Sequence, residues 1–179
     1  MNKYSFDERL AFSNGIVGAT CLDTIKAMMI GVDKIERSTL KDDKNGIDYW
    51  VTLRRGARVG IDHKARDSGC SRFWTNGEPE LSLELWSVLP ENGNAGVVGW
   101  TLSETKNTDY TLHTFDKKDT DQCYLLPFQL LRMAFRSRCK DWMKMMRGPA
   151  IQNSGRWKSQ CVFVPAFMVL DAIQEAMVN

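Results

Sequence analysis

The sequence predicts an α/β fold in which a mixed central β-sheet is flanked by helices. Three observations favour this class. Apolar and polar residues alternate in several segments between residues 47 and 88, which is typical of half-buried strands. Apolar residues recur at helical spacing before that block and again after Pro127. The resulting order of helix, strands, helix, strand and helix is typical of a sheet covered by helices.

Length and composition predict a single cytoplasmic domain over residues 1–179. The mass is 20.4 kDa, and 24 basic against 22 acidic residues leave a net charge of +2. This balance excludes a histone-like polyanion binder but leaves room for a local basic patch. No apolar run approaches the roughly 20 residues of a membrane span, and the first residues lack a signal-peptide pattern. Five cysteines without a C-x-x-C pair favour reduced thiols.

The first two thirds of the chain predict one helix followed by strands. Residues 5–30 carry apolar side chains at helical spacing, and residues 41–46 predict a polar turn. Two alternating segments flank Gly56 and predict a hairpin. The further expected elements are a third strand at residues 80–88, a loop at 91–96, a fourth strand at 98–102 and an extended piece at 110–115.

The last third of the chain predicts two helices around a strand. Pro127 suits the first turn of a helix that continues towards Met145 and ends at Gly148-Pro149. Residues 152–159 predict a polar loop, and residues 161–164 predict a short buried strand. Pro165 then begins the C-terminal helix.

The chemistry-bearing side chains gather on the predicted hairpin and the third strand. Alternation places Asp48, Asp62 and Lys64 opposite the apolar residues of their strands. With a three-residue loop at residues 55–57, Asp48 lies across from Lys64 on a shared face. A loop of two or four residues would separate these two side chains. Glu84 falls on the polar side of the third strand, so we expect two or three carboxylates and an ammonium in one patch.

Carboxylates that converge in this way repel one another unless a cation intervenes. Hard oxygen ligands suit Mg²⁺ or Mn²⁺, which keep several waters and can bind a substrate phosphate. Such a metal activates water and neutralises charge that develops on a phosphodiester, and a nearby lysine assists. The pattern therefore predicts metal-dependent phosphodiester hydrolysis. The same residues also fit a solvated polar face with an ion pair between Asp48 and Lys64 across the hairpin.

The segments Gly46-Ile47-Asp48 and Asp62-His63-Lys64, followed by Glu84 in a strand, resemble the PD-(D/E)XK nuclease superfamily. Ile47 stands where the superfamily's name has proline. The Asp-x-Lys spacing alone is common in this chain, so the strand context and the upstream Asp48 single out this copy. The predicted order of elements also fits that superfamily. The resemblance implies a restriction-endonuclease-like three-layer core.

The resemblance also implies a role for each matching residue. Asp48 and Asp62 would be metal ligands for Mg²⁺ or Mn²⁺, joined by the backbone carbonyl of His63. Lys64 would be the catalytic lysine, and Glu84 a further catalytic acid. Members of the superfamily often carry another acid on the first helix, for which Glu8 and Asp23 are both candidates.

Several basic residues are candidates for contact with nucleic acid. A stripe of cations recurs every four residues on the predicted helix after Pro127, which suits a phosphate backbone or an ordinary solvated face. A loop near residue 157 combines cations with a tryptophan, which suits base stacking or packing at a core edge. The resemblance adds a lysine near the later strands. The candidates are Arg132, Arg136, Lys140, Lys144, Arg156, Lys158 and Lys106.

Three functions follow, and the first is the leading prediction. It is a divalent-metal-dependent endo- or exonuclease that acts on DNA, in phage or mobile-element DNA processing or in repair. The second is a catalytically inactive nuclease-like binding module, such as a phage-encoded inhibitor that docks to a host defence protein or to nucleic acid. The third is a subunit whose nuclease-like domain serves assembly. A homodimer fits the first and the third function equally well.

Overall fold

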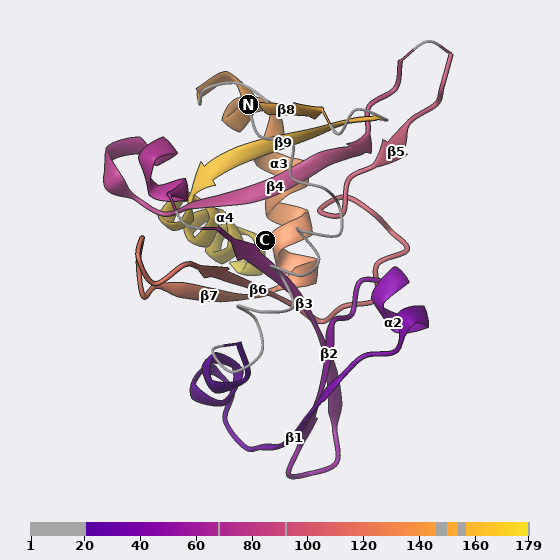
Figure 1. The fold of residues 1–179 in the computed structure, drawn as a ribbon, viewed down its shortest axis with the longest axis vertical. Helices are drawn as coiled ribbons and strands as arrows, with labels where there is room; N and C mark the ends of the chain where they lie inside the picture. Colours follow the sequence, from indigo (N-terminus) through magenta and orange to yellow (C-terminus); the bar gives the residue numbers. More distant parts are fainter. Residues whose placement is uncertain (1–20, 68, 92, 146–149, 154–156, 179) are drawn as a thin grey trace. The chain divides into compact units, whose positions relative to one another are not determined.

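The computed structural model describes residues 21–67, 69–91, 93–145, 150–153 and 157–178. The chain forms two compact units, each with its own sheet (Figure 1). The first unit comprises Met1–Cys70 and Asn107–Leu126, and the second comprises Ser71–Lys106 and Pro127–Asn179. None of the helices in the described ranges combines the length and the apolar character that a membrane span requires.

The first unit contains a mixed five-stranded sheet with the strand order β1-β2-β3-β6-β7. Its strands are β1 (Val32–Arg37), β2 (Tyr49–Leu53), β3 (Arg58–Arg66), β6 (Tyr110–Phe115) and β7 (Cys123–Pro127). β1, β2 and β3 pair antiparallel in chain order, whereas β3 pairs in parallel with β6. Two strands adjacent in the sheet are thus separated by more than forty residues of chain.

One face of this sheet packs against the helix formed by residues 21–28. Tyr49, Val51 and Ile61 are buried with Cys21 and Ile25 of that helix. These strand residues are the apolar members of the predicted alternation, so burying them fixes which face each strand turns inward. Residues 21–28 confirm the described part of the predicted helix over 5–30, and its earlier part lies outside the described residues.

The β2–β3 hairpin forms as predicted, but its register differs. Val51 pairs with Val59 and Thr52 with Arg58, and the Leu53 N–H donates to the Ala57 carbonyl at 2.8 Å. The loop therefore consists of residues 54–56 instead of 55–57. Gly56 adopts φ of +81°, a left-handed conformation suited to the third position of a three-residue hairpin loop. The glycine's conformational preference thus sets the register two residues away from the predicted one.

The second unit contains a four-stranded antiparallel sheet with the order β5-β4-β9-β8. Its strands are β4 (Glu80–Val88), β5 (Val97–Val98), β8 (Ala150–Asn153) and β9 (Lys158–Pro165). Both α3 (Phe128–Met145) and α4 (Ala166–Val178) contact β9 and each other. Leu131, Phe135 and Val169 on these helices are fully buried. Two 3₁₀ turns, Cys70–Phe73 and Thr75–Gly77, precede β4.

The fold class is confirmed: the chain is mixed α/β, with a mixed central sheet and helices flanking sheet strands. The strands near residues 80–88, 110–115 and 161–164 and both later helices are also confirmed. Whether residues 1–179 form one domain stays a prediction.

Several local predictions are wrong, either because a polar segment forms regular structure or because a strand ends earlier than expected. Residues 41–46 were expected to be a turn, but α2 (Leu40–Lys44) forms because the Thr39 hydroxyl accepts the Asp42 N–H. The polar loop expected at residues 152–159 is shorter than predicted, because its two ends belong to β8 and β9, which pair there. The fourth strand expected at 98–102 ends at Val98, since the Leu102 N–H turns back to the Gly99 carbonyl. β1 and β7 were not predicted.

Candidate active site

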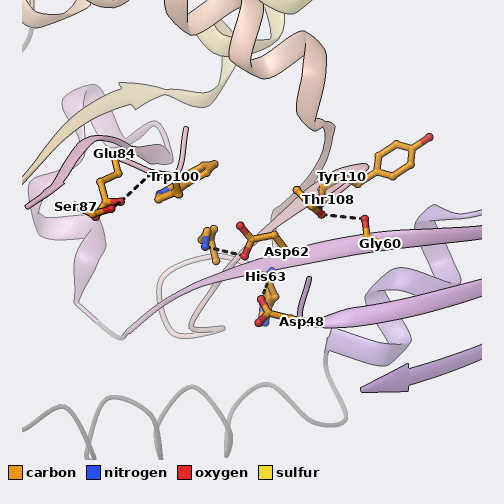
Figure 2. A network of polar contacts seen from close by, with 10 residues as sticks. Asp48, Gly60, Asp62, His63, Glu84, Ser87, Trp100, Thr108 and Tyr110 are labelled. Atoms are coloured by element: carbon orange, nitrogen blue, oxygen red, sulfur yellow. Dashed lines mark hydrogen bonds and ion pairs between the residues drawn. The ribbon is translucent and has the colours of Figure 1, made fainter. Parts of the chain in front are cut away.

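Asp48 and Asp62 meet where the β2–β3 hairpin opens away from its turn. Asp48 directly precedes β2, and its N–H donates to the Ile61 carbonyl at 2.8 Å. Its carboxylate Oδ2 accepts the backbone N–H of His63 at 2.6 Å (Figure 2). This contact brings the Asp48 side chain back across the strand pair towards its neighbour Asp62. The convergence of these two carboxyl groups, expected from the sequence, is present in the structure.

The Asp62 carboxyl group is buried and paired with a lysine. Asp62 is 2% exposed, and its Oδ1 accepts a hydrogen bond from Lys64 Nζ at 2.7 Å. The two residues stand two positions apart on β3 and therefore project from the same face of the strand. A buried carboxylate requires a charged or hydrogen-bonding partner, because desolvation otherwise disfavours its ionised form. Lys64 is one such partner here.

The electrostatics of the pair favour a proton on Asp48. Burial first, and then the negative charge of Asp62, raise the pKa of Asp48 to about 6. Lys64 and the His63 N–H oppose the shift but do not cancel it, and a hydrogen bond with the Asp62 carboxyl adds to it. Two carboxyl groups this close cannot both ionise without cost unless positive charge enters the site. The pair therefore holds a proton below about pH 6, and a cation that enters the site would displace it.

Two neutral histidines border the carboxyl pair. The His63 ring Nε2 lies 2.7 Å from the Thr114 hydroxyl, and burial lowers the pKa of its imidazole to about 4. His113 on β6 pairs in register with Lys64 and is 1% exposed. Burial first, and then the Lys64 charge, lowers its pKa to about 3. Neither ring adds positive charge at neutral pH, so the Lys64 ammonium remains the important local cation.

His113 was not predicted from the sequence to be a neighbour of the pair. Its only local signal is the alternation of Thr111, His113 and Phe115 along β6, which marks a shared strand face. The parallel pairing that sets Lys64 beside His113 joins distant segments and cannot be read from alternation.

The expected pairing of Asp48 with Lys64 across the hairpin is wrong. Because the loop comprises residues 54–56, Tyr49 pairs with Ile61, and Lys64 lies further along β3 than the position opposite Asp48. Lys64 instead forms its ion pair with Asp62 on its own strand. The parity argument still brought the acids together, since both registers use a loop with an odd number of residues.

Glu84 does not join the predicted patch on the hairpin's sheet. It lies on β4, which belongs to the other sheet, whereas the neighbour of β3 is β6. Its Oε2 accepts hydrogen bonds from the Ser87 hydroxyl at 2.5 Å and from the Trp100 N–H at 3.0 Å (Figure 2). These contacts hold the segment after β5 against β4. The carboxylate thus has a structural task within the second unit.

The two aspartates fit Mg²⁺ or Mn²⁺ in part. One or two carboxylates suffice for an ion that retains several waters and meets a substrate phosphate, and a pair of hard oxygen donors suits both ions. The described part of the chain contains no group of three or more histidine, cysteine or acidic residues placed to hold a metal. Of the first-helix candidates, Asp23 is exposed on helix 21–28, and Glu8 lies outside the described residues.

Three of the seven predicted nucleic-acid contacts are bonded to other groups of the second unit. Arg132 donates to the Ser103 carbonyl at 2.8 Å, and Arg136 pairs with Glu104 at 2.8 Å. Lys158 pairs with Glu91 at 2.9 Å. These three side chains therefore have partners within the protein, and their positions do not require a bound nucleic acid. The other predicted contacts are Lys140 and Lys144, which are exposed, Lys106, which is half-buried, and Arg156, which lies outside the described residues.

Comparisons with protein-family models, with curated proteins and with solved structures give no match to this chain. The nuclease resemblance therefore rests on the chain's own residues, and the case for a function has to be made from the geometry around Asp48 and Asp62.

Proposed function

We propose that this chain is a divalent-metal-dependent phosphodiester hydrolase that acts on DNA. The observation that carries the proposal is the pairing of half-buried Asp48 with buried Asp62, with Lys64 bonded to Asp62 on the same strand. A pair of acids whose ionisation is opposed by burial and by mutual repulsion has an unmet demand for positive charge. A hydrated Mg²⁺ or Mn²⁺ ion meets that demand with the donors it prefers.

The proposed roles follow from the position of each group. Asp48 and Asp62 would hold the metal, which when bound supplies an acidified water and charge neutralisation at the phosphate. His63 holds the Asp48 carboxylate in place through its backbone N–H, so the ligand is oriented before a substrate arrives. Lys64 would leave its ion pair with Asp62 as the metal takes over that charge. Its ammonium is then available to orient the attacking water or to stabilise the phosphate in the transition state.

A cleavage assay on a panel of nucleic acids tests the proposal. The panel comprises linear, circular, single-stranded and branched DNA and an RNA duplex, each with Mg²⁺, with Mn²⁺ and with chelator. We expect cleavage of DNA that chelator and Asp62→Asn both abolish, with the folded state of the variant checked by circular dichroism. Cleavage that persists in Asp62→Asn would contradict the assignment of the site.

A binding module without catalytic activity is the second candidate. Two observations favour it: only two acids meet at the site within the described residues, and Arg136 and Lys158 are paired with acids. This candidate predicts nucleic-acid or protein binding that is unchanged by chelator and by Asp62→Asn, together with no cleavage of any substrate in the panel. Binding that is lost with chelator or in Asp62→Asn, or cleavage of any substrate in the panel, would count against this candidate.

A further inference from the structure

The turn of the β2–β3 hairpin is an exposed cationic tip. Residues 54–58 are all exposed, and they include Arg54, Arg55 and Arg58. No acidic residue occurs between Tyr49 and Ile61. Within the described part of the chain, neither Arg54 nor Arg55 has a side-chain hydrogen bond or an ion pair. Arg54 and Arg55 therefore concentrate positive charge at the tip although the whole chain is nearly neutral, whereas Arg58 lies near the acidic Glu36 and Asp42.

The backbone of this tip is held in place. The Leu53 N–H donates to Ala57 at 2.8 Å, and the Arg54 N–H donates to the Gly31 carbonyl at 2.8 Å. The first bond closes the three-residue loop, and the second ties it to the residue that precedes β1. Two arginines on a fixed loop lose less conformational entropy on binding than two arginines on a free one.

Arg58 connects the tip to the active-site face of the sheet. Its guanidinium lies over the Trp50 ring, 4.4 Å from the centroid, and the Trp50 indole N–H donates to Asp42 at 3.2 Å. Arg58 and Asp62 are an even number of residues apart on β3, so both side chains project from the same face, opposite the buried Ile61. Arg58 and the carboxyl pair thus lie on the same face of the hairpin, on which Asp62 itself is buried.

The hairpin fixes the separation between the tip and the carboxyl pair. Asp62 and Arg58 are four residues apart, which at about 3.4 Å per residue is roughly 14 Å. The loop lies about two residues further, so Arg54 and Arg55 stand roughly 20 Å from the pair. A DNA duplex rises about 3.4 Å per base pair, and this distance corresponds to about six base pairs. A stiff duplex holds phosphates at such a separation, whereas a flexible single strand does not.

We propose that Arg54 and Arg55, with Arg58 beside them, bind the phosphate backbone of duplex DNA about six base pairs from the bond that is cleaved. This inference rests on the proposed function for the position of the scissile bond. Binding of the duplex by the tip does not require cleavage. Arginine suits the task because its planar guanidinium makes paired hydrogen bonds to phosphate oxygens.

The test compares Arg54→Ala/Arg55→Ala with the matched variant Lys117→Ala/Lys118→Ala. The second pair removes the same charge from another exposed turn of the first unit. Binding is measured by fluorescence anisotropy, with chelator present, on a labelled duplex of about 20 base pairs and on the corresponding single strand. Salt is varied between about 50 and 200 mM. The conservative Arg54→Lys/Arg55→Lys variant tests the charge alone.

We expect the arginine double variant to bind the duplex about tenfold more weakly, with the slope of log affinity against log salt reduced by about 2. The Lys117/Lys118 control should retain most of the affinity, and the lysine variant, which keeps the charge but loses the paired hydrogen bonds, should retain the salt slope with weaker binding than wild type. Equal weakening by the Lys117/Lys118 control, or equal arginine dependence on the single strand, would overturn the inference.

Cleavage separates this inference from the proposed function. If the wild type cleaves DNA and the arginine variant binds as tightly as wild type, DNA binding by the tip is refuted and the proposed active site is retained. A chain that binds duplex through the tip without cleaving it refutes the nuclease and retains the tip as a DNA contact. The spacing is tested by shortening the duplex on each side of the cleaved bond: the arginine effect should vanish once fewer than about six base pairs remain on one side.

Discussion

β3 and β4 form a natural comparison, because both are nine-residue strands with an acid on their polar side. Asp62 on β3 is buried, bonded to Lys64 and coupled to Asp48. Glu84 on β4 accepts from Ser87 and from the Trp100 backbone. The first acid belongs to a charged pair that suits a cation, whereas the second fixes a loop. The partners of an acid therefore indicate its role better than its place in a strand pattern.

The largest expected contrast is in cleavage. Asp62→Asn should lower metal-dependent cleavage by about 10³-fold, because it removes a ligand charge from the site. Glu84→Gln should keep the rate within about threefold of wild type, since its carboxylate acts within the second unit. Single-turnover rates at saturating Mg²⁺ measure both effects. Equal losses of cleavage rate in the two variants would contradict the different roles assigned to Asp62 and Glu84.

Lys64→Ala should destabilise the metal-free protein. It removes an ammonium from a buried carboxylate, and breaking a buried ion pair from one side costs about 3 kcal/mol. Asp62→Asn/Lys64→Met removes both charges and should recover much of that loss. Urea unfolding at neutral pH measures the free energy of unfolding of each variant. A double variant as unstable as Lys64→Ala would show that the ion pair is not the source of the effect.

Asp48→Asn should change how stability depends on pH in the metal-free protein. The folded protein holds the Asp48 proton up to about pH 6, whereas an unfolded aspartate releases it near pH 4. Between these values the folded state binds more protons, so Asp48 makes the free energy of unfolding fall as pH rises. Relative to wild type, Asp48→Asn should gain roughly 2 to 3 kcal/mol between about pH 4 and pH 7.

Unfolding curves for both proteins at four pH values in this window check the sign. Asn retains an oxygen that can accept the His63 N–H, so the comparison isolates the charge. A difference in stability that does not vary with pH would contradict the raised pKa.

The smallest expected effect is the stability of Glu84→Gln. Glutamine retains one carbonyl oxygen for the Trp100 N–H and loses the charge-assisted part of the bonds, which is worth about 1 kcal/mol. Thermal unfolding measures it, with Glu78→Gln as a control on an exposed acid. A larger loss, together with impaired cleavage, would assign Glu84 a task beyond fixing the loop.

The sequence predicts local features of this molecule well and distant pairings poorly. Alternation found β2, β3 and β4, and helical spacing found α3 and α4, because each pattern is set by one element and its buried face. The meeting of Asp48 and Asp62 depends on one short hairpin, so parity was sufficient to predict it.

The failures come from the same cause. β3 pairs with β6 rather than with β4, and no alternation pattern specifies which strand lies beside another. Glu84 was therefore assigned to the wrong sheet, and His113 was missed. The register error at residues 54–56 is different in kind: Gly56 with its positive φ belongs at the last position of the loop, and that preference was available in the sequence.

Manganese binding measured by electron paramagnetic resonance is the sharpest test of a metal site at Asp48 and Asp62, because it needs neither a substrate nor turnover. The free Mn²⁺ signal is followed as wild type, Asp48→Asn, Asp62→Asn and Glu84→Gln are added in turn. We expect wild type and Glu84→Gln to bind the ion and both aspartate variants to lose at least about tenfold in affinity. Binding that survives in Asp62→Asn, or no binding by wild type, would contradict a metal site at this pair.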